Sequence, residues 1–167
     1  NDRLGFVKRF RKFMDKKYPD MPVIMSEWTH MQGGRDYGMD SALVTAKTMY
    51  EDFTLLNAVS WQHWIAVSEV DYCDGLIYIN LDDKTFEITK RYYVTGNYSK
   101  YVKPGSKRIE AMCDDEKVLV TAFKNEEEIV LVLVNNSAEE KSFSLPYNKE
   151  IVASVTDENS NLKECVV

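Results

Sequence analysis

The sequence predicts an α/β region followed by an antiparallel β region, with the boundary near residue 104. In the first region, segments with apolar residues at helical spacing alternate with short apolar runs of strand type. This helix–strand alternation is typical of a parallel sheet with crossover helices. After residue 105 the spacing changes to short β-rich runs separated by turns, which is typical of an antiparallel β-sandwich.

Helices are expected over residues 3–17, from about residue 40 to 56, and over residues 89–102. The apolar stripe of the first helix is Leu4, Val7, Phe10 and Met14. Asp40 or Ser41 can cap the second helix. The stripe of the second helix is Leu43, Ala46, Met49 with Tyr50, Phe53 and Leu56.

Strands are expected between and after these helices. Residues 22–26 form a continuous apolar run, as in a strand buried on both faces of a parallel sheet. Residues 58–65 and 76–80 are the next strand-like segments. Further β-rich runs are residues 118–123, 129–134, 142–145 and 151–155, separated by segments with turn chemistry, the last of them at residues 146–148.

The predicted domains are residues 1–104 and residues 105–167, the second incomplete at its C-terminus. The apolar stripe of the first helix begins at residue 4. An amphipathic helix needs a surface on which to bury such a stripe. At the other end, residues 164–167 stop within an extended apolar segment. The chain is therefore expected to be an internal part of a longer protein.

The composition excludes several classes of protein. With 44% hydrophobic residues, 7 Gly and 4 Pro, the chain is neither disordered nor collagen-like, and no apolar run is long enough for a membrane span. The net charge of −6 disfavours nucleic acid as a partner. The 3 Cys residues lack the spacing of a zinc site or a disulfide framework, so no metal is expected.

Glu27 is the most informative residue because it directly follows the expected strand at residues 22–26. In parallel α/β sheets, ligands and chemistry are found at the carboxyl ends of the strands. Strict alternation places Glu27 on the face of Val23 and Met25. Trp28 then shares the opposite face with Ile24. Position alone leaves open whether Glu27 is catalytic or a solvated loop carboxylate.

A second group of side chains comes from the end of the next expected strand. Alternation places Gln62 and Trp64 on one face, and Trp61 and His63 on the other. A Trp ring stacks on the C–H face of a sugar, and Gln offers both a donor and an acceptor to hydroxyl groups. Trp61 and His63 are expected to pack in the core, whereas Trp64 can be either a core or a site residue.

The acidic residues Glu69, Asp71 and Asp74 form a third group. Three carboxylates within six residues could hold a cation, but their spacing is not that of a calcium loop. The preferred interpretation is a solvated loop.

Four segments resemble glycoside hydrolase family 30. They are residues 22–28 (PVIMSEW), 58–64 (AVSWQHW), 74–77 (DGLI) and 90–105 (KRYYVTGNYSKYVKPG), and the last is the most specific. The resemblance covers roughly residues 4–156. It implies the last strands and helices of a (β/α)8 TIM barrel followed by an antiparallel β-sandwich side domain.

The resemblance also implies site residues. Residues 23–26 would be the seventh barrel strand, Glu27 the catalytic nucleophile, and Trp64 an aromatic residue that lines the sugar site. Gln62 and Trp28 are the other candidate substrate contacts. The acid/base glutamate of the family would precede residue 1, in the missing N-terminal part of the barrel.

The implied parent is a secreted, retaining β-glycanase that needs no cofactor. Its substrate would be a polysaccharide such as xylan or β-1,6-galactan, and the isolated chain is expected to be inactive. Two alternatives stay open. A non-catalytic carbohydrate-binding module built around Trp64 and the sandwich would bind glycans regardless of Glu27. A plain structural domain would bind none.

Overall fold

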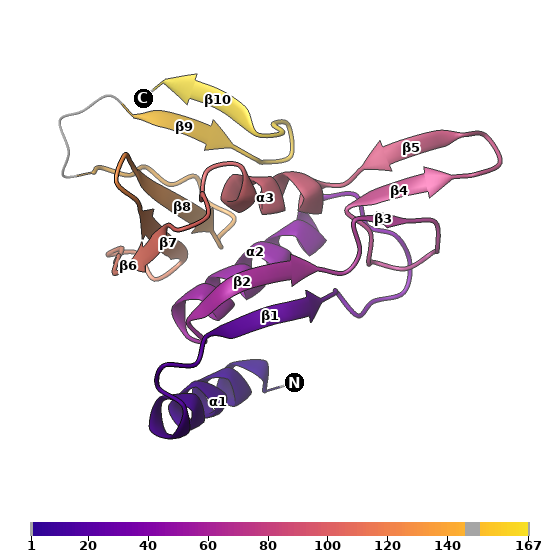
Figure 1. The fold of residues 1–167 in the computed structure, drawn as a ribbon. Helices are drawn as coiled ribbons and strands as arrows, with labels where there is room; N and C mark the ends of the chain where they lie inside the picture. The colour runs from indigo at the N-terminus through magenta and orange to yellow at the C-terminus, as the bar shows by residue number, and fades with distance from the viewer. Residues whose placement is uncertain (1, 146–150, 167) are drawn as a thin grey trace.

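A computed structural model describes residues 2–145 and 151–166 of the 167-residue chain. The first elements are α1 (Arg3–Lys17), β1 (Val23–Trp28), α2 (Met39–Thr54) and β2 (Ala58–His63). Strands β1 and β2 pair in parallel, and in Figure 1 α1 lies next to β1 and α2 next to β2. The two helices also contact each other, because Arg3 of α1 forms ion pairs with Glu51 and Asp52 of α2. The parallel helix–strand alternation predicted from the sequence is therefore confirmed.

A small mixed sheet and a third helix follow: β3 (Val67–Ser68), β4 (Ile77–Asn80), β5 (Thr85–Ile88) and α3 (Lys90–Ser99). Strand β3 is parallel to β4, and β4 and β5 form an antiparallel hairpin that projects from the molecule (Figure 1). Strand β5 was not expected from the sequence.

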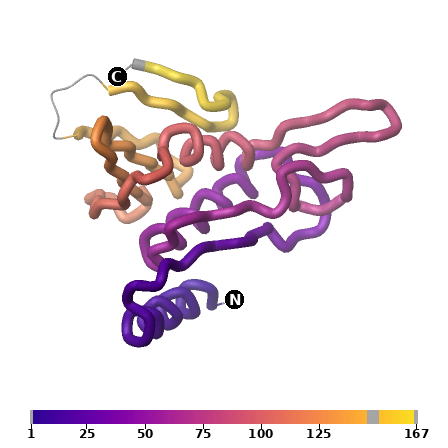
Figure 2. The backbone as a smooth tube through the Cα atoms, in the orientation of Figure 1, coloured from indigo at the N-terminus to yellow at the C-terminus, as the bar shows by residue number. Residues whose placement is uncertain are grey.

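The C-terminal region contains two antiparallel sheets, β6–β7–β8 and β9–β10. Their strands are β6 (Lys107–Ile109), β7 (Val118–Lys124), β8 (Ile129–Asn135), β9 (Val152–Val155) and β10 (Lys163–Val166). The chain trace in Figure 2 brings the β9–β10 hairpin back alongside α3, where Asn97 Nδ2 donates to Ser154 O at 3.3 Å.

The strand predicted at residues 142–145 is wrong, because this segment has no strand partner in the described structure. Its alternation of Ser, Phe, Ser and Leu fits a strand locally, but a strand also needs a neighbour for its backbone hydrogen bonds. The turn predicted at residues 146–148 lies outside the described residues.

Helix α2 is the centre of the core. One cluster joins α1 to the parallel strands through Val7, Met14, Val23, Leu56 and Ala58. Two further clusters join α2 and α3 to the sheet β6–β7–β8, and they are built on Ala42, Ala46 and Val94, and on Met49, Tyr98, Phe123 and Val132. Burial raises the pKa of Tyr98 to about 12, so its hydroxyl stays protonated beside Thr121.

The start of α2 differs from the prediction. The helix begins at Met39 after Gly38, and neither Asp40 nor Ser41 caps it through its side chain. Asp36 takes this role from outside the helix, because its carboxylate accepts hydrogen bonds from the amides of Gly38 at 2.7 Å and Ser41 at 3.0 Å.

The expectation that the first strand is buried on both faces is also wrong. Val23 is buried, but Ile24 is 52% exposed, and Leu4 in the predicted stripe of α1 is 42% exposed. Within the described residues, no further strand pairs with β1 or β2 and no layer covers Ile24.

Candidate functional site

Glu27 lies near the carboxyl end of β1, at an irregular point of the sheet. Met25 pairs with Trp61, and Trp28 pairs with His63, so β1 places two residues opposite the single residue between Trp61 and His63. This is the arrangement of a β-bulge, which re-aims side chains and is common next to active sites. Glu27 is exposed.

The bulge changes the faces predicted for β1. Trp28 lies against Trp61 and His63, with ring centroids 5.6 and 5.9 Å away. It therefore shares the face of Met25, which pairs with Trp61, and the expectation that it shares the face of Ile24 is wrong. Because the bulge adds one residue between Met25 and Trp28, Trp28 lies on this face and not on the opposite one. As a result, Trp28 lies in an aromatic cluster with Trp61 and His63.

Trp61 is held by the core, as expected. Its indole Nε1 donates to Asp52 Oδ2 on α2 at 2.8 Å. The other oxygen of this fully buried carboxylate accepts a hydrogen bond from Arg3 of α1 at 2.5 Å. One carboxylate thus ties α1 and α2 to β2, which carries Gln62 and directly precedes Trp64.

Gln62 and Trp64 are both exposed, and Trp64 is 50% exposed. Gln62 is the residue of β2 opposite the bulge that contains Glu27. The amide of Trp64 donates to Trp28 O at 2.8 Å, which extends the parallel pairing beyond β2. The Trp64–Ile65 peptide bond is cis. The structure thus brings Glu27, Gln62 and Trp64 to the ends of two adjoining strands.

The loop after β1, residues 29–38, is joined to the segment between β2 and β4, residues 64–76. This segment includes the two-residue strand β3 and is called the loop after β2. The amide of Cys73 donates to Gln32 O at 3.0 Å, and the amide of Gly34 donates to Asp71 O at 3.3 Å. Arg35 adds bonds from its amide to Asp71 Oδ1 and from its guanidinium to the Val70 and Glu69 carbonyls. The two loops therefore form one wall beside the strand ends.

The acidic loop is only partly solvated. Glu69 and Asp71 are exposed, but Asp74 is 9% exposed, which corrects the expectation for this residue. The carbonyl oxygen of Asp74 accepts bonds from His63 Nε2 at 2.7 Å and from the Ile65 amide at 2.9 Å. The backbone carbonyl of Asp74 therefore fastens the end of β2.

Arg91 is a site-supporting residue that the sequence analysis missed. It is fully buried, and its guanidinium donates to groups in both loops. A signal was present, because Arg91, Val94 and Tyr98 recur at i, i+3 and i+7 on the buried side of α3. A charged residue in such an apolar stripe needs a polar partner inside the fold.

Burial and hydrogen bonding shift three titratable groups around these loops. Burial lowers the pKa of His63 below its ordinary 6.5, against the opposite effect of its bond to Asp74. Burial would raise the pKa of Asp36, but the N–H groups of Gly38 and Ser41 stabilise its carboxylate, and its pKa lies below the ordinary 3.8. Burial raises the pKa of the Tyr78 hydroxyl.

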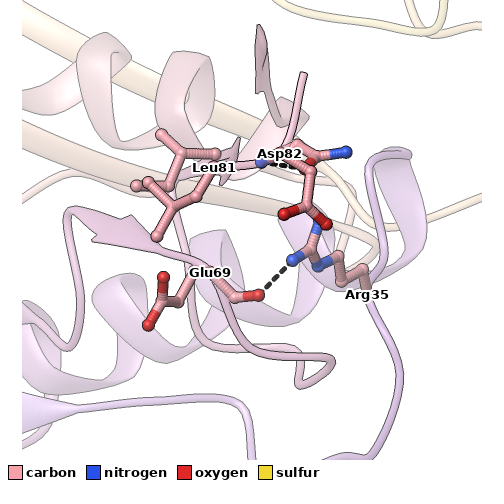
Figure 3. A pocket seen from close by; sticks show the side chains of 6 residues that line it. Arg35, Glu69, Leu81 and Asp82 are labelled. Carbon is pink, nitrogen blue, oxygen red and sulfur yellow. Dashed lines mark hydrogen bonds between the residues drawn. The ribbon is translucent and has the colours of Figure 1, made fainter. Parts of the chain in front are cut away.

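A shallow pocket of about 320 Å³ lies beside the strand ends, between the joined loops and the β4–β5 turn (Figure 3). Its lining includes Arg35, Glu69, Leu81 and Asp82. Neither Glu27 nor Trp64 lines it, and two nitrogens of the Arg35 guanidinium already donate to loop carbonyls. We therefore centre the candidate site on the strand ends rather than on this pocket.

Among residues 2–145 and 151–166, no three His, Cys, Asp or Glu side chains are grouped so that they could hold a metal ion. In the same residues, no helix has the length and apolar character needed to cross a membrane.

Two family models match the chain. The model for O-glycosyl hydrolase family 30 matches residues 21–78, and the model for the glycosyl hydrolase family 30 β-sandwich domain matches residues 105–161. Together they cover more than half of the chain.

Solved structures share the fold. A family 30 subfamily 8 xylanase from Clostridium acetobutylicum is 20% identical, with a TM-score of 0.68 over 86% of this chain and 36% of that one. An endoxylanase from Clostridium papyrosolvens is 20% identical, with a TM-score of 0.71 over 92% of this chain and 38% of that one. Xylanase C from Talaromyces cellulolyticus is 18% identical, with a TM-score of 0.74 over 88% and 35%.

The chain thus spans little more than a third of the length of the proteins it matches. Its parallel strands and helices, followed by antiparallel sheets, correspond to the C-terminal parts of their fold, as the sequence analysis expected. The two family models and the shared fold agree, and the chain belongs to glycoside hydrolase family 30.

Proposed function

We propose that this chain carries the nucleophile half of a retaining β-glycanase site. The observation that carries the proposal is the position of Glu27 at a bulged strand end, opposite Gln62 and one strand away from the exposed Trp64. Glu27 attacks the anomeric carbon and forms a glycosyl-enzyme, while Trp64 stacks on a sugar ring and Gln62 binds hydroxyl groups. The packing of Trp28 against Trp61 favours Gln62 and Trp64 over Trp28 as substrate contacts.

A retaining mechanism needs a second carboxyl group about 5–5.5 Å from the first, to protonate the leaving oxygen and then activate water. By the family resemblance, this group belongs to a segment that precedes residue 1. We therefore propose that the chain alone is inactive and that a companion segment supplies the acid/base. The domain boundary follows residue 104, with barrel elements before it and the side domain from residue 105 onward.

The proposed substrate is a polysaccharide outside the cell. Xylan is the first candidate, because three of the similar structures are xylanases by name, and β-1,6-galactan is the second. Both are neutral β-linked backbones whose C–H faces suit a Trp platform.

The first measurement is the native mass of the purified protein, followed by hydrolysis of xylan and β-1,6-galactan. We expect no hydrolysis by a species that contains only the 19.4 kDa chain. A species that contains a companion chain should hydrolyse one of the two glycans, and Glu27→Gln should reduce this to background. The matched control is Glu69→Gln, which removes another exposed carboxylate on the neighbouring loop.

Two outcomes would contradict the proposal. Hydrolysis by the 19.4 kDa chain alone, lost in Glu27→Gln, would disprove the need for a companion segment. Activity that survives Glu27→Gln would disprove the role of the nucleophile.

The exposed Trp64 also favours the alternative of a non-catalytic glycan-binding module. In that case Trp64→Ala should weaken glycan binding roughly tenfold or more, a loss of about 1.4 kcal/mol. Glu27→Gln should then leave glycan binding unchanged, and no species, with or without the substitution, should hydrolyse glycan.

A further inference from the structure

Arg91 is a buried cation that the proposed chemistry does not use. It lies in the first turn of α3 and is 0% exposed. Its hydrogen-bond acceptors are neutral groups, and in the described part of the chain no carboxylate forms an ion pair with it. Burying a charge costs several kcal/mol even after relaxation. A role in fixing one arrangement of the surrounding chain would explain why an arginine occupies this position.

The acceptors of Arg91 come from three separate segments. One guanidinium nitrogen, Nη1, reaches Asp36 O at 2.8 Å in the loop after β1, and also the hydroxyl of Ser41. The same nitrogen lies 3.2 Å from Cys73 Sγ in the loop after β2. The other nitrogen, Nη2, donates to Gly75 O at 2.6 Å in this second loop and to Tyr78 OH at 3.0 Å on β4.

Further hydrogen bonds connect the segment held by Arg91 to the two neighbours of Trp64. Gly75, held by Arg91, follows Asp74, whose carbonyl oxygen binds His63 Nε2 at 2.7 Å and the Ile65 amide at 2.9 Å. These two residues flank Trp64 on both sides. Tyr78 reinforces the same segment, because its hydroxyl accepts a bond from the Gly75 amide at 3.2 Å and donates to Tyr72 O at 2.5 Å.

Trp64 is in turn joined to the strand that carries Glu27. Its amide donates to Trp28 O at 2.8 Å, and Trp28 directly follows Glu27. A displacement of the loop after β2 would therefore move the Trp64 ring relative to the Glu27 carboxylate.

We propose that Arg91 is a positioning residue of the glycan site, which sets the place of Trp64 relative to Glu27 by fastening both strand-end loops to α3. The inference rests on the proposed function, because it assumes that Trp64 and Glu27 meet the same substrate. Arginine suits this role better than lysine, because its planar fork of five N–H donors reaches several fixed acceptors at once.

The test uses the complete chain, labelled with 5-fluorotryptophan and observed by ¹⁹F NMR. The chain has 3 Trp residues, so Trp→Phe variants assign the three resonances. In Arg91→Met we expect the Trp64 resonance to shift by more than its linewidth, while the core Trp61 resonance stays in place. Arg91→Lys should give a smaller shift, because an ammonium group has fewer donors and no fork.

The matched control is Lys90→Met, one residue earlier on the same helix. Lys90 Nζ binds Asp157 O at 2.5 Å and Asn161 Oδ1 at 2.7 Å, on the side of α3 that faces the β9–β10 hairpin. This variant should loosen that hairpin and leave the Trp64 resonance unchanged.

An unchanged Trp64 resonance in folded Arg91→Met or Arg91→Lys would overturn the proposal. Loss of the fold in both variants would also overturn it, because Arg91 would then be a residue of global stability. A separate titration with xylohexaose tests the function itself, with an expected tenfold or greater weakening in Arg91→Met. If Trp64 moves in Arg91→Met but neither xylohexaose nor a β-1,6-galactan oligosaccharide shifts a resonance of the unaltered chain, the positioning role stands and the proposed function fails.

Discussion

His63 shows how a single side chain links the site to the stability of the fold. Its Nε2 must carry a proton, because it donates to the carbonyl oxygen of Asp74. The ring lies against both Trp28 and Trp61, so a second proton would place a charge in apolar surroundings. Burial accordingly lowers its pKa.

The lowered pKa of His63 predicts a pH dependence of stability. The unfolded chain binds a proton near 6.5, whereas the folded chain binds it only at lower pH. The contribution of His63 is therefore fully present above about pH 6.5 and is lost as the pH falls through the folded-state value. We expect the free energy of unfolding, measured by urea titration, to fall between about pH 7.5 and about pH 5.

The control for this effect is His63→Gln, which keeps an N–H donor for Asp74 but does not titrate. Its unfolding free energy should vary less over the same pH range. Asp36 and Asp157 also have lowered pKa values, but their ordinary value is 3.8. They therefore change the free energy of unfolding only at more acidic pH. An equal pH dependence in both proteins would show that other groups cause it.

The residues of the candidate site were predictable to different degrees. Glu27 and Trp64 follow from position, because the carboxyl end of a parallel strand is recognisable in the sequence. The face of Trp28 was not predictable, because one extra residue in the bulge reverses strict alternation. The contacts of Arg91 depend on loops that are far apart in the sequence, so only its place in the buried stripe could indicate its burial.

At the scale of elements, the β9–β10 hairpin depends on a close contact with α3. Leu162 has a backbone φ of 51°, and its side chain fills the space above Gly96. A Cβ on Gly96 would lie 2.6 Å from Leu162 Cδ1. Gly96 therefore lowers the stability of the helix but leaves room for the Leu162 side chain of the hairpin.

This contact predicts that Gly96→Ala destabilises the unaltered chain but stabilises the Leu162→Ala variant. In the unaltered chain, Gly96→Ala gains about 1 kcal/mol of helix propensity but crowds Leu162, which costs about 1–3 kcal/mol. We expect a net loss of up to about 2 kcal/mol. In Leu162→Ala the same substitution should stabilise the chain by up to about 1 kcal/mol. A urea double-mutant cycle measures both, and equal effects in the two backgrounds would refute the contact.

Some elements could be predicted from their own sequence, whereas others depend on a partner that is distant in the chain. The helices and the strands β1, β2, β7 and β8 carry apolar periodicity within their own sequence, and the predictions for them are confirmed. All four residues of β5 are exposed, and the strand is held by its pairing with β4, for example Ile88 with Ile77, so periodicity alone did not predict it. Residues 142–145 show the converse, a strand-like pattern without a partner.

At the scale of the whole molecule, the parallel pair β1–β2 lacks the cover that such sheets normally have. Parallel sheets are buried on both faces, yet Ile24 is 52% exposed and Val59 is 65% exposed. The solved structures that share this fold are nearly three times as long as the part that matches. We therefore interpret this surface as the contact for the proposed companion segment.

An uncovered surface of this kind should make the isolated chain associate. We expect the purified chain to form species above 19.4 kDa at micromolar concentration, observed by light scattering during size-exclusion chromatography. Ile24→Lys combined with Val59→Lys should shift the protein toward the monomer, because association through this face would bury two unpaired charges. Leu81→Lys combined with Phe86→Lys is the control, because both residues are 65% exposed on the distant β4–β5 hairpin and the pair adds the same two charges elsewhere. Monomer at every concentration would contradict the role of this surface. An equal effect of the control pair would instead assign the association to net charge or to the hairpin.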